Sequence, residues 1–326
     1  HMERTFFARA FTLRNGVRLL PVLVLGIVCL VVGKGWWDSR VFHGYDPGLP
    51  LDAKVVSHGE LEGHPIEKIE LTGLAGERIP VRLIRPGKVS GEKVPCVIFL
   101  YGIGQNARFF ERIAPIFAEA GFAMAMPEQF QCGERRKRGL GIVREALALR
   151  ERSSRIVPET RRLVDLLGQV PGIDAARLSL IGASYGGITA CSVLAQEPRI
   201  TSAALVMAGG NLPRLLDSLA RSRKSDSRIV APLAARLGAW LLSPFEPLNF
   251  VGKVSPRPLL FLDVSNDEMI DPACADALFE AAGAPKERRL YEGPHNTISE
   301  DTVRRMLADA LDWLADQPKA RGRGER

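Results

Sequence analysis

The 326-residue chain has few cysteines, and they form no pattern that binds a metal or builds a disulfide framework. Cys29, Cys96, Cys132, Cys191 and Cys274 are scattered, with no CxxC pair and no Cys/His cluster. We therefore expect most of them to be buried thiols, and we expect no metal site. Hydrophobic residues make up 46% of the chain and charged residues 25%, the balance of a packed globular protein. This composition excludes a disordered chain, a collagen-like repeat and a polytopic membrane protein.

The central part of the chain also lacks an excess of charge of one sign. The net charge is +7, but +4 of it lies in residues 1–40 and +2 in residues 316–326, which leaves about +1 for the rest. A nucleic-acid-binding protein carries its positive charge on a folded face or a recognition element. We therefore expect no nucleic-acid partner.

Residues 19–33 (LLPVLVLGIVCLVVG) form an uncharged apolar run that is shorter than the roughly 20 residues of a membrane-spanning helix. Lys34 can snorkel, and Trp36 and Trp37 suit a membrane interface, so the segment extends over residues 19–37. Four arginines precede the run, which orients an inserted helix with its N-terminus in the cytoplasm.

We therefore predict an N-terminal apolar segment over residues 1–40 that anchors the chain to a membrane, with the domain over residues 41–326 outside the cytoplasm. Two alternatives remain. In the first, the segment is a helix docked on the protein itself and the chain is cytoplasmic. In the second, the segment is a cleaved signal peptide, although no A-x-A-like site follows the run.

From about residue 67 the chain alternates between strand-like and helix-like segments. This alternation predicts the α/β class, with a mostly parallel central sheet and helices on both faces. Residues 209–257 interrupt it and are expected to form a helical insertion. The expected strands are 68–71, 79–84, 94–100, 122–126, 177–181, 202–207, 258–264 and 288–291; the expected helices are 106–120, 158–170, 185–196, 272–282 and 299–315.

The expected strand over residues 177–181 runs directly into Gly182-Ala183-Ser184-Tyr185-Gly186, and a helix follows at once. This is a G-x-S-x-G motif in a strand–turn–helix context, which exposes a nucleophilic serine on a strained turn. The flanking residues are glycines because side chains there would collide across the turn. Ser184 is therefore the candidate nucleophile.

A serine hydroxyl needs a base to take its proton, and in this arrangement the base follows the acid in chain order. Only His295 follows Ser184 among the histidines, and it lies between the last expected strand and the last expected helix. The acid should follow the strand over residues 258–264. Asp267, at the tip of that turn, is the candidate that can orient His295. The alternatives in the same segment are Asp263, Glu268 and Asp271.

Acyl transfer also needs an oxyanion hole, a pair of N–H groups that bind the negative oxygen of the tetrahedral intermediate. One donor is the N–H of Tyr185, the residue after the nucleophile. The other comes from the loop Tyr101-Gly102-Ile103-Gly104-Gln105, where glycines let the backbone approach a substrate closely. We expect the second donor to be the N–H of Ile103.

Four motifs carry a resemblance to a known family: YGIGQ over residues 101–105, GASYGG over 182–187, SNDEMID over 265–271 and GPH over 293–295. Through them the chain from about residue 67 to 316 resembles the α/β-hydrolase superfamily, in particular its dienelactone-hydrolase-like and acetyl-esterase-like branch. The resemblance implies the α/β-hydrolase fold with residues 209–257 as a cap. It also implies that residues 127–134 border the substrate pocket, so Gln129 joins Tyr101 and Gly102 as expected substrate-binding residues.

The chain departs from the family pattern at three places. Tyr101 stands where a His-Gly pair is common, and Asp263-Val264 stand where another often occurs. The nucleophile is a serine rather than the cysteine of true dienelactone hydrolases, which favours a general ester hydrolase.

The resemblance therefore implies a serine carboxylic-ester hydrolase that works through an acyl-enzyme intermediate on a small-molecule ester. It needs no metal ion or organic cofactor. We expect short-chain esters because a roofed pocket has a fixed volume. The alternatives are a serine peptidase of the prolyl-oligopeptidase type and a non-catalytic binding module of the same fold. The sequence makes no prediction of oligomeric state.

Overall fold

The computed structural model describes residues 24–87, 91–105, 107–136, 142–222 and 230–317. The chain forms two compact units, His1–His43 and Gly44–Arg326. The described part of the first unit contains a helix over residues 24–38. Residues 19–23 of the predicted anchor lie outside the described residues. Among the helices that are described, none combines the length and the apolar character needed to cross a membrane.

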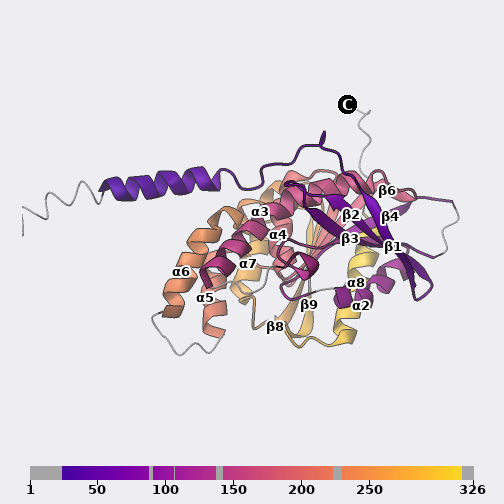
Figure 1. The fold of residues 1–326 in the computed structure, drawn as a ribbon. Helices are drawn as coiled ribbons and strands as arrows, with labels where there is room; N and C mark the ends of the chain where they lie inside the picture. The colour runs from indigo at the N-terminus through magenta and orange to yellow at the C-terminus, as the bar shows by residue number, and fades with distance from the viewer. Residues whose placement is uncertain (1–23, 88–90, 106, 137–141, 223–229, 318–326) are drawn as a thin grey trace, which may run out of the picture. The chain divides into compact units, whose positions relative to one another are not determined.

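The second unit is built on a nine-stranded sheet in the order β1-β2-β3-β5-β4-β6-β7-β8-β9 (Figure 1). The three pairs β1–β2, β2–β3 and β3–β5 are antiparallel. The remaining pairs, from β5–β4 to β8–β9, are parallel. The strands are β1 (Lys54–Leu61), β2 (His64–Thr72), β3 (Arg78–Ile84), β4 (Val94–Leu100), β5 (Ala123–Pro127), β6 (Ile173–Ala183), β7 (Ile200–Val206), β8 (Leu259–Asn266) and β9 (Lys286–Pro294).

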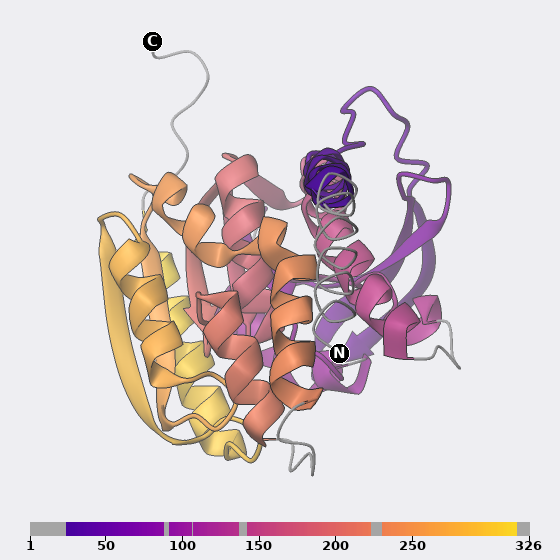
Figure 2. The same ribbon diagram turned by 90° about the vertical axis from the view of Figure 1, so that its left-hand side faces the viewer.

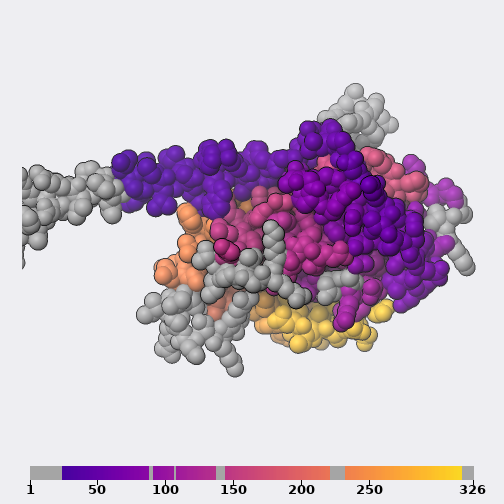
Figure 3. Space-filling view, viewed as in Figure 1, coloured from indigo at the N-terminus to yellow at the C-terminus, as the bar shows by residue number. Residues whose placement is uncertain are grey.

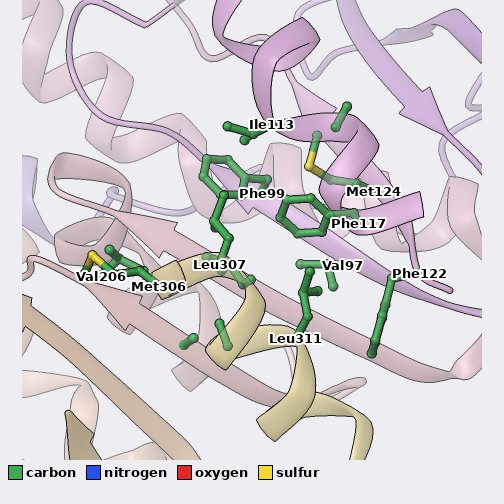
Figure 4. Close-up of a cluster of buried hydrophobic side chains, with 14 of the residues drawn as sticks. Val97, Phe99, Ile113, Phe117, Phe122, Met124, Val206, Met306, Leu307 and Leu311 are labelled. Atoms are coloured by element: carbon green, nitrogen blue, oxygen red, sulfur yellow. The ribbon is translucent and has the colours of Figure 1, made fainter. Parts of the chain in front are cut away.

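Helices cover both faces of this sheet. Helices α2 (Ala107–Glu119) and α8 (Glu300–Ala315) pack on one face, where their apolar side chains meet those of β4, β5 and β7 (Figure 4). Helices α3 (Ile142–Leu167), α4 (Tyr185–Gln196) and α7 (Pro272–Ala281) lie on the other face. Each central strand is therefore buried on both sides, as its continuous apolar sequence requires.

The chain between β7 and β8 forms a helical layer, which we call the cap. It contains α5 (Leu212–Ser222) and α6 (Val230–Leu242), which pack side by side (Figure 2). Three short 3₁₀ turns, Ser243–Phe245, Pro247–Asn249 and Val251–Val254, lead back to the sheet. In the space-filling view the cap, in orange, lies on the side opposite the first strands, in violet (Figure 3).

The structure confirms the expected α/β class with a mostly parallel sheet. Two expectations were wrong in detail. Helix α3 begins at Ile142 rather than at residue 158, because Pro158 lies inside the helix and does not start it. Strand β1 was not predicted, since seven of its eight residues are exposed and its ordering depends on backbone pairing with β2 at the sheet edge.

Candidate active site

Ser184 is the single residue between strand β6 and helix α4. Its backbone has φ 53° and ψ −118°, a conformation that is strained for a residue with a side chain. The Ser184 N–H donates to the carbonyl oxygen of Val206 in the neighbouring strand β7 at 2.8 Å. The Ser184 carbonyl oxygen accepts from the N–H of Ile188 at 3.0 Å. The sheet and the helix thus hold the strained turn from both sides.

Gly182 and Gly186 permit this turn because they face each other across it. A Cβ on Gly182 would lie 2.7 Å from the Gly186 carbonyl oxygen. A Cβ on Gly186 would lie 1.9 Å from the carbonyl oxygen of Leu100, at the end of β4. Both distances are shorter than non-bonded atoms can approach, and the packed surroundings leave no room for either atom to move away. Both positions therefore require glycine, for the reason that the motif itself suggests.

His295 follows directly after strand β9 and reaches the serine. Its Nε2 lies 3.0 Å from the Oγ of Ser184, a hydrogen-bond distance. The imidazole is 9% exposed, so little water competes for its two nitrogens. A base at this position can take the serine proton.

Asp267 lies directly after strand β8 and orients the histidine from its other side. The Asp267 Oδ2 lies 2.8 Å from the Nδ1 of His295, and the carboxylate is 8% exposed. Its Oδ1 accepts from the N–H groups of Met269 at 2.8 Å and Ile270 at 2.6 Å. Both carboxylate oxygens are therefore used, which fixes the plane of the group. The structure brings Ser184, His295 and Asp267 into one line of hydrogen bonds.

The three alternative acids have other partners. Asp263 is buried, and its Oδ2 accepts from the Nε of Arg288 at 2.7 Å. Burial raises the pKa of Asp263 to about 6, although Arg288 opposes the shift. Asp271 caps helix α7 by accepting from the N–H of Ala273 at 2.9 Å.

Glu268 has a function in the site that the sequence reasoning missed. Its carboxylate accepts from the N–H of His295 at 2.8 Å and from the N–H of Asn296 at 2.7 Å. Its slight burial raises the pKa of Glu268, but the two N–H donors outweigh this and hold the pKa below the usual value. Glu268 therefore clamps the backbone that carries His295. The signal in the sequence was its position next to Asp267.

The loop after β4 lies against the nucleophile. A Cβ added to Gly102 would be only 3.3 Å from the Cβ of Ser184, so the loop lies in tight contact with the nucleophile. Ile103 follows Gly102, and Tyr185 starts helix α4. Among the described residues, neither the Ile103 N–H nor the Tyr185 N–H makes a hydrogen bond within the protein. Both donors are thus free for an oxygen bound near Ser184.

Ser184, His295 and Gly102 lie in the wall of a cavity of about 770 Å³. Apolar side chains from the cap and from helices α2 and α8 form most of the remaining wall: Phe109, Leu212, Leu215, Leu216, Leu219, Leu242, Val303 and Leu307. Its charged residues, Arg112 and Glu300, are exposed and lie 3.5 Å apart as an ion pair. The cavity therefore suits an uncharged, largely apolar molecule.

Two of the expected substrate-binding residues do not line this cavity. Tyr101 is 2% exposed and Gln129 1% exposed, and their polar atoms bind each other. The Gln129 N–H donates to the Tyr101 hydroxyl oxygen at 2.9 Å, and the Gln129 Nε2 donates to the Tyr101 carbonyl oxygen at 2.9 Å. Both residues support the loop from behind, whereas Gly102 faces the cavity.

The described residues contain no cluster of three or more histidine, cysteine, aspartate or glutamate side chains that could hold a metal ion. The polar groups that line the cavity include Ser184 and His295, and Asp267 supports His295 from behind.

No family model matches the chain. Esterase YjfP of Escherichia coli (strain K12) is 26% identical over 204 residues, which cover 59% of this chain and 76% of the relative. The YitV protein of Bacillus subtilis (strain 168) is 27% identical over 239 residues, 68% of this chain and 88% of the relative. The crystal structure of acetyl xylan esterase 1 from Thermoanaerobacterium sp. JW/SL YS485 matches with a TM-score of 0.66 at 16% identity, covering 86% of this chain and 93% of that chain.

Proposed function

Given that the chain is a carboxylesterase-type hydrolase with the α/β-hydrolase fold, we propose that it cleaves esters through an acyl-enzyme intermediate on Ser184. One observation carries the proposal. The hydrogen bonds from Ser184 Oγ to His295 Nε2 and from His295 Nδ1 to Asp267 Oδ2 lie at the wall of an apolar cavity. Together they supply a nucleophile, a base and a group that orients the base.

In the first half of the reaction, Ser184 Oγ attacks the ester carbonyl carbon while His295 Nε2 takes the hydroxyl proton. The carbonyl oxygen becomes negative, and the N–H groups of Ile103 and Tyr185 bind it. Asp267 stabilises the imidazolium through Nδ1. The intermediate then collapses: the bond to the alcohol oxygen breaks, and His295 returns the proton to the leaving alcohol.

In the second half, water replaces the alcohol. His295 takes a proton from the water molecule as its oxygen attacks the acyl carbon. The same two N–H groups bind the second oxyanion. Collapse breaks the bond to Ser184 Oγ, which recovers its proton from His295, and the carboxylic acid leaves.

We propose an uncharged ester with an acyl chain of roughly two to six carbons, because a roofed pocket has a limited volume. Two features support this choice. Leucine side chains of α5 in the cap line one side of the cavity, and residues of α2 and α8 line its other side. The volume of about 770 Å³ has to hold the alcohol part of the ester as well as its acyl part.

The test is a series of p-nitrophenyl esters of increasing acyl length, assayed with wild type and Ser184→Ala. We expect turnover that peaks at short chains and falls by orders of magnitude in the variant, with an unchanged melting temperature. A fluorophosphonate probe should label wild type at one residue, Ser184, and leave the variant unlabelled. Turnover by Ser184→Ala above about 1% of wild type would contradict the mechanism.

We also propose that residues 19–37 attach the protein to a membrane, with the domain outside the cytoplasm. Leu25, Val28 and Val32 on the helix over residues 24–38 are 49–64% exposed, which supports contact with an apolar phase. The unmodified 326-residue chain should float with lipid vesicles in a density gradient. A variant with Val28→Asp and Val32→Asp should remain at the bottom, and equal flotation of both would refute the proposal.

A further inference from the structure

A buried polar network lies behind the candidate oxyanion donors, and the reaction steps above do not use it. Its centre is Arg152 of helix α3, which is 6% exposed. The Arg152 Nε donates to the Gln129 Oε1 at 2.9 Å, and its Nη2 donates to the same oxygen. Gln129 is 1% exposed, so this contact is closed to water.

On one side the network reaches the loop that carries Ile103. Gln129 Nε2 donates to the carbonyl oxygen of Tyr101 at 2.9 Å. That carbonyl belongs to the peptide unit before Gly102, and the Ile103 N–H belongs to the unit after it. The Ile103 N–H direction is set by the two backbone dihedrals of Gly102, and glycine restricts these less than any other residue. A hydrogen bond to the Tyr101 carbonyl therefore restrains one side of this flexible link. The Gln129 amide supplies that restraint.

On the other side the network reaches Tyr185, whose N–H is the other donor. The Arg152 guanidinium carbon lies 4.4 Å from the centre of the Tyr185 ring, a cation–π contact. The Tyr185 hydroxyl lies 2.8 Å from the Oγ of Ser153, which itself donates to the Leu149 carbonyl oxygen at 2.9 Å. Helix α3 therefore grips the Tyr185 side chain at its face and at its tip.

The charge of Arg152 is not needed to balance another charge. Within the described part of the chain, no carboxylate forms an ion pair with Arg152, and its hydrogen bonds go to a neutral amide. Burying a cation without a counterion is costly, so a residue chosen for packing alone would be neutral. What Arg152 adds is one rigid planar group that contacts the supports of both donors at once.

We propose that Arg152 is a positioning residue for the oxyanion hole, acting through Gln129 on Ile103 and through the Tyr185 ring on the Tyr185 N–H. This inference rests on the proposed ester hydrolysis. Misplaced N–H donors reduce the stabilisation of the transition state more than they reduce substrate binding. Loss of Arg152 should therefore lower kcat and leave KM nearly unchanged.

The experiment compares a p-nitrophenyl ester with the matching thionoester, whose carbonyl oxygen is replaced by sulfur. Sulfur is a weak hydrogen-bond acceptor, so the thionoester gains less from the two N–H groups. The ratio of the two kcat/KM values therefore reports on the oxyanion hole. It is insensitive to a loss of folded enzyme, because both substrates meet the same preparation.

For Arg152→Lys we expect kcat for the ester to fall about 10- to 100-fold, less than the loss of a whole oxyanion donor. The ester-to-thionoester ratio should fall by a similar factor, and KM should stay within about twofold. Gln129→Glu is a second variant for the case in which Arg152→Lys does not fold. It preserves shape and pairs with Arg152, but it removes the N–H that holds the Tyr101 carbonyl, so the ratio should fall again.

Arg162→Lys is the matched control. Arg162 lies on the same helix and is 1% exposed, but it donates to the carbonyl oxygens of Thr72 and Pro50, away from the cavity. We expect a lower melting temperature and an unchanged ratio.

An unchanged ratio in Arg152→Lys and Gln129→Glu, together with Ser184-dependent turnover by wild type, would overturn this inference alone. Turnover by the Ser184→Ala variant at the level of wild type would overturn the proposed function and this inference with it.

Discussion

The substitution Asp267→Asn tests the line of hydrogen bonds by changing a single atom. Asp267 Oδ1 accepts from the N–H groups of Met269 and Ile270, and only an oxygen can do so. The new asparagine must therefore keep its oxygen there and turn its NH₂ group toward His295 Nδ1. Because an NH₂ group only donates, Nδ1 has to accept, and the imidazole proton moves to Nε2.

This tautomer is the wrong one for catalysis. The Nε2–H then points at the Oγ of Ser184, 3.0 Å away, and cannot take its proton. In a well-characterised Ser-His-Asp triad the same Asp→Asn change lowers kcat about 10⁴-fold while the geometry survives. Four decades correspond to about 5.5 kcal/mol in the activation free energy. We expect a loss of this size here, because the two N–H donors fix which way the new amide faces.

The assay is kcat and KM on p-nitrophenyl butyrate, with melting temperatures to check the fold. Asp271→Asn is the first control: asparagine caps a helix as well as aspartate does, so activity should stay within about twofold. Asp263→Asn is the second control and should keep most activity, because Asp263 contacts Arg288 rather than His295. Asp267→Asn activity above about 1% of wild type, or an equal loss in Asp271→Asn, would refute the reasoning.

Three further changes follow from the same contacts. Glu268→Ala should lower kcat several-fold, and Glu268→Gln should lower it less because the glutamine oxygen can still accept from the N–H of His295. Equal kcat values for both variants and wild type would show that Glu268 does not hold the His295 backbone. Gly186→Ala should unfold the protein or lower the free energy of unfolding, measured in urea, by at least about 3 kcal/mol, roughly the upper range for overpacking. The reason is that its Cβ would collide with the Leu100 carbonyl oxygen, and a wild-type urea midpoint would disprove this clash. Burial raises the pKa of Asp263 from 3.8 to about 6, so the folded state binds this proton more tightly than the unfolded state. The free energy of unfolding should therefore fall by about 2 kcal/mol as the pH rises from 4 to 6, and urea midpoints of Asp263→Asn should lack this fall.

The elements that the sequence predicted best are those whose environment is uniform along their length. Residues 94–100 and 185–196 were expected as a strand and a helix, and β4 and α4 have the same bounds. β4 is a continuous apolar run, the pattern typical of a strand that is covered on both faces. α4 is bounded at its start by the glycine-rich turn.

The missed elements depend on contacts that are distant in sequence. β1 has an exposed pattern, and the sheet edge of β2 is what orders it. The start of α3 was obscured by Pro158, since proline is more common at a first helical turn than inside a helix.

Site residues that depend on contacts distant in sequence were likewise hard to predict. Ser184 follows from a local motif, and His295 is the only histidine after it in the chain, so the sequence alone suggested both. The supporting role of Gln129 depends on Arg152, which lies 23 residues further along the chain on another element. A buried polar side chain cannot be distinguished from a pocket residue until its partner is known.

The strand order explains why these groups meet above one part of the sheet. In a parallel sheet the carboxyl ends of all strands lie at the same edge, and ligands bind there. Strands β4 and β6 are neighbours, so the loop with Gly102 and Ile103 lies beside the turn with Ser184. Strands β8 and β9 are also neighbours, so Asp267 and His295 meet directly.

Strand β7 separates these two pairs, and the cap is the segment that follows it. A chain that leaves the sheet between the nucleophile strand and the acid strand has to rise over the site before it returns. The leucines of α5 consequently line the same cavity as Ser184. Changes in the length or sequence of this one segment should therefore alter the acyl-chain preference while leaving the hydrogen bonds among Ser184, His295 and Asp267 intact, because those residues are held by strand ends that the cap does not contain.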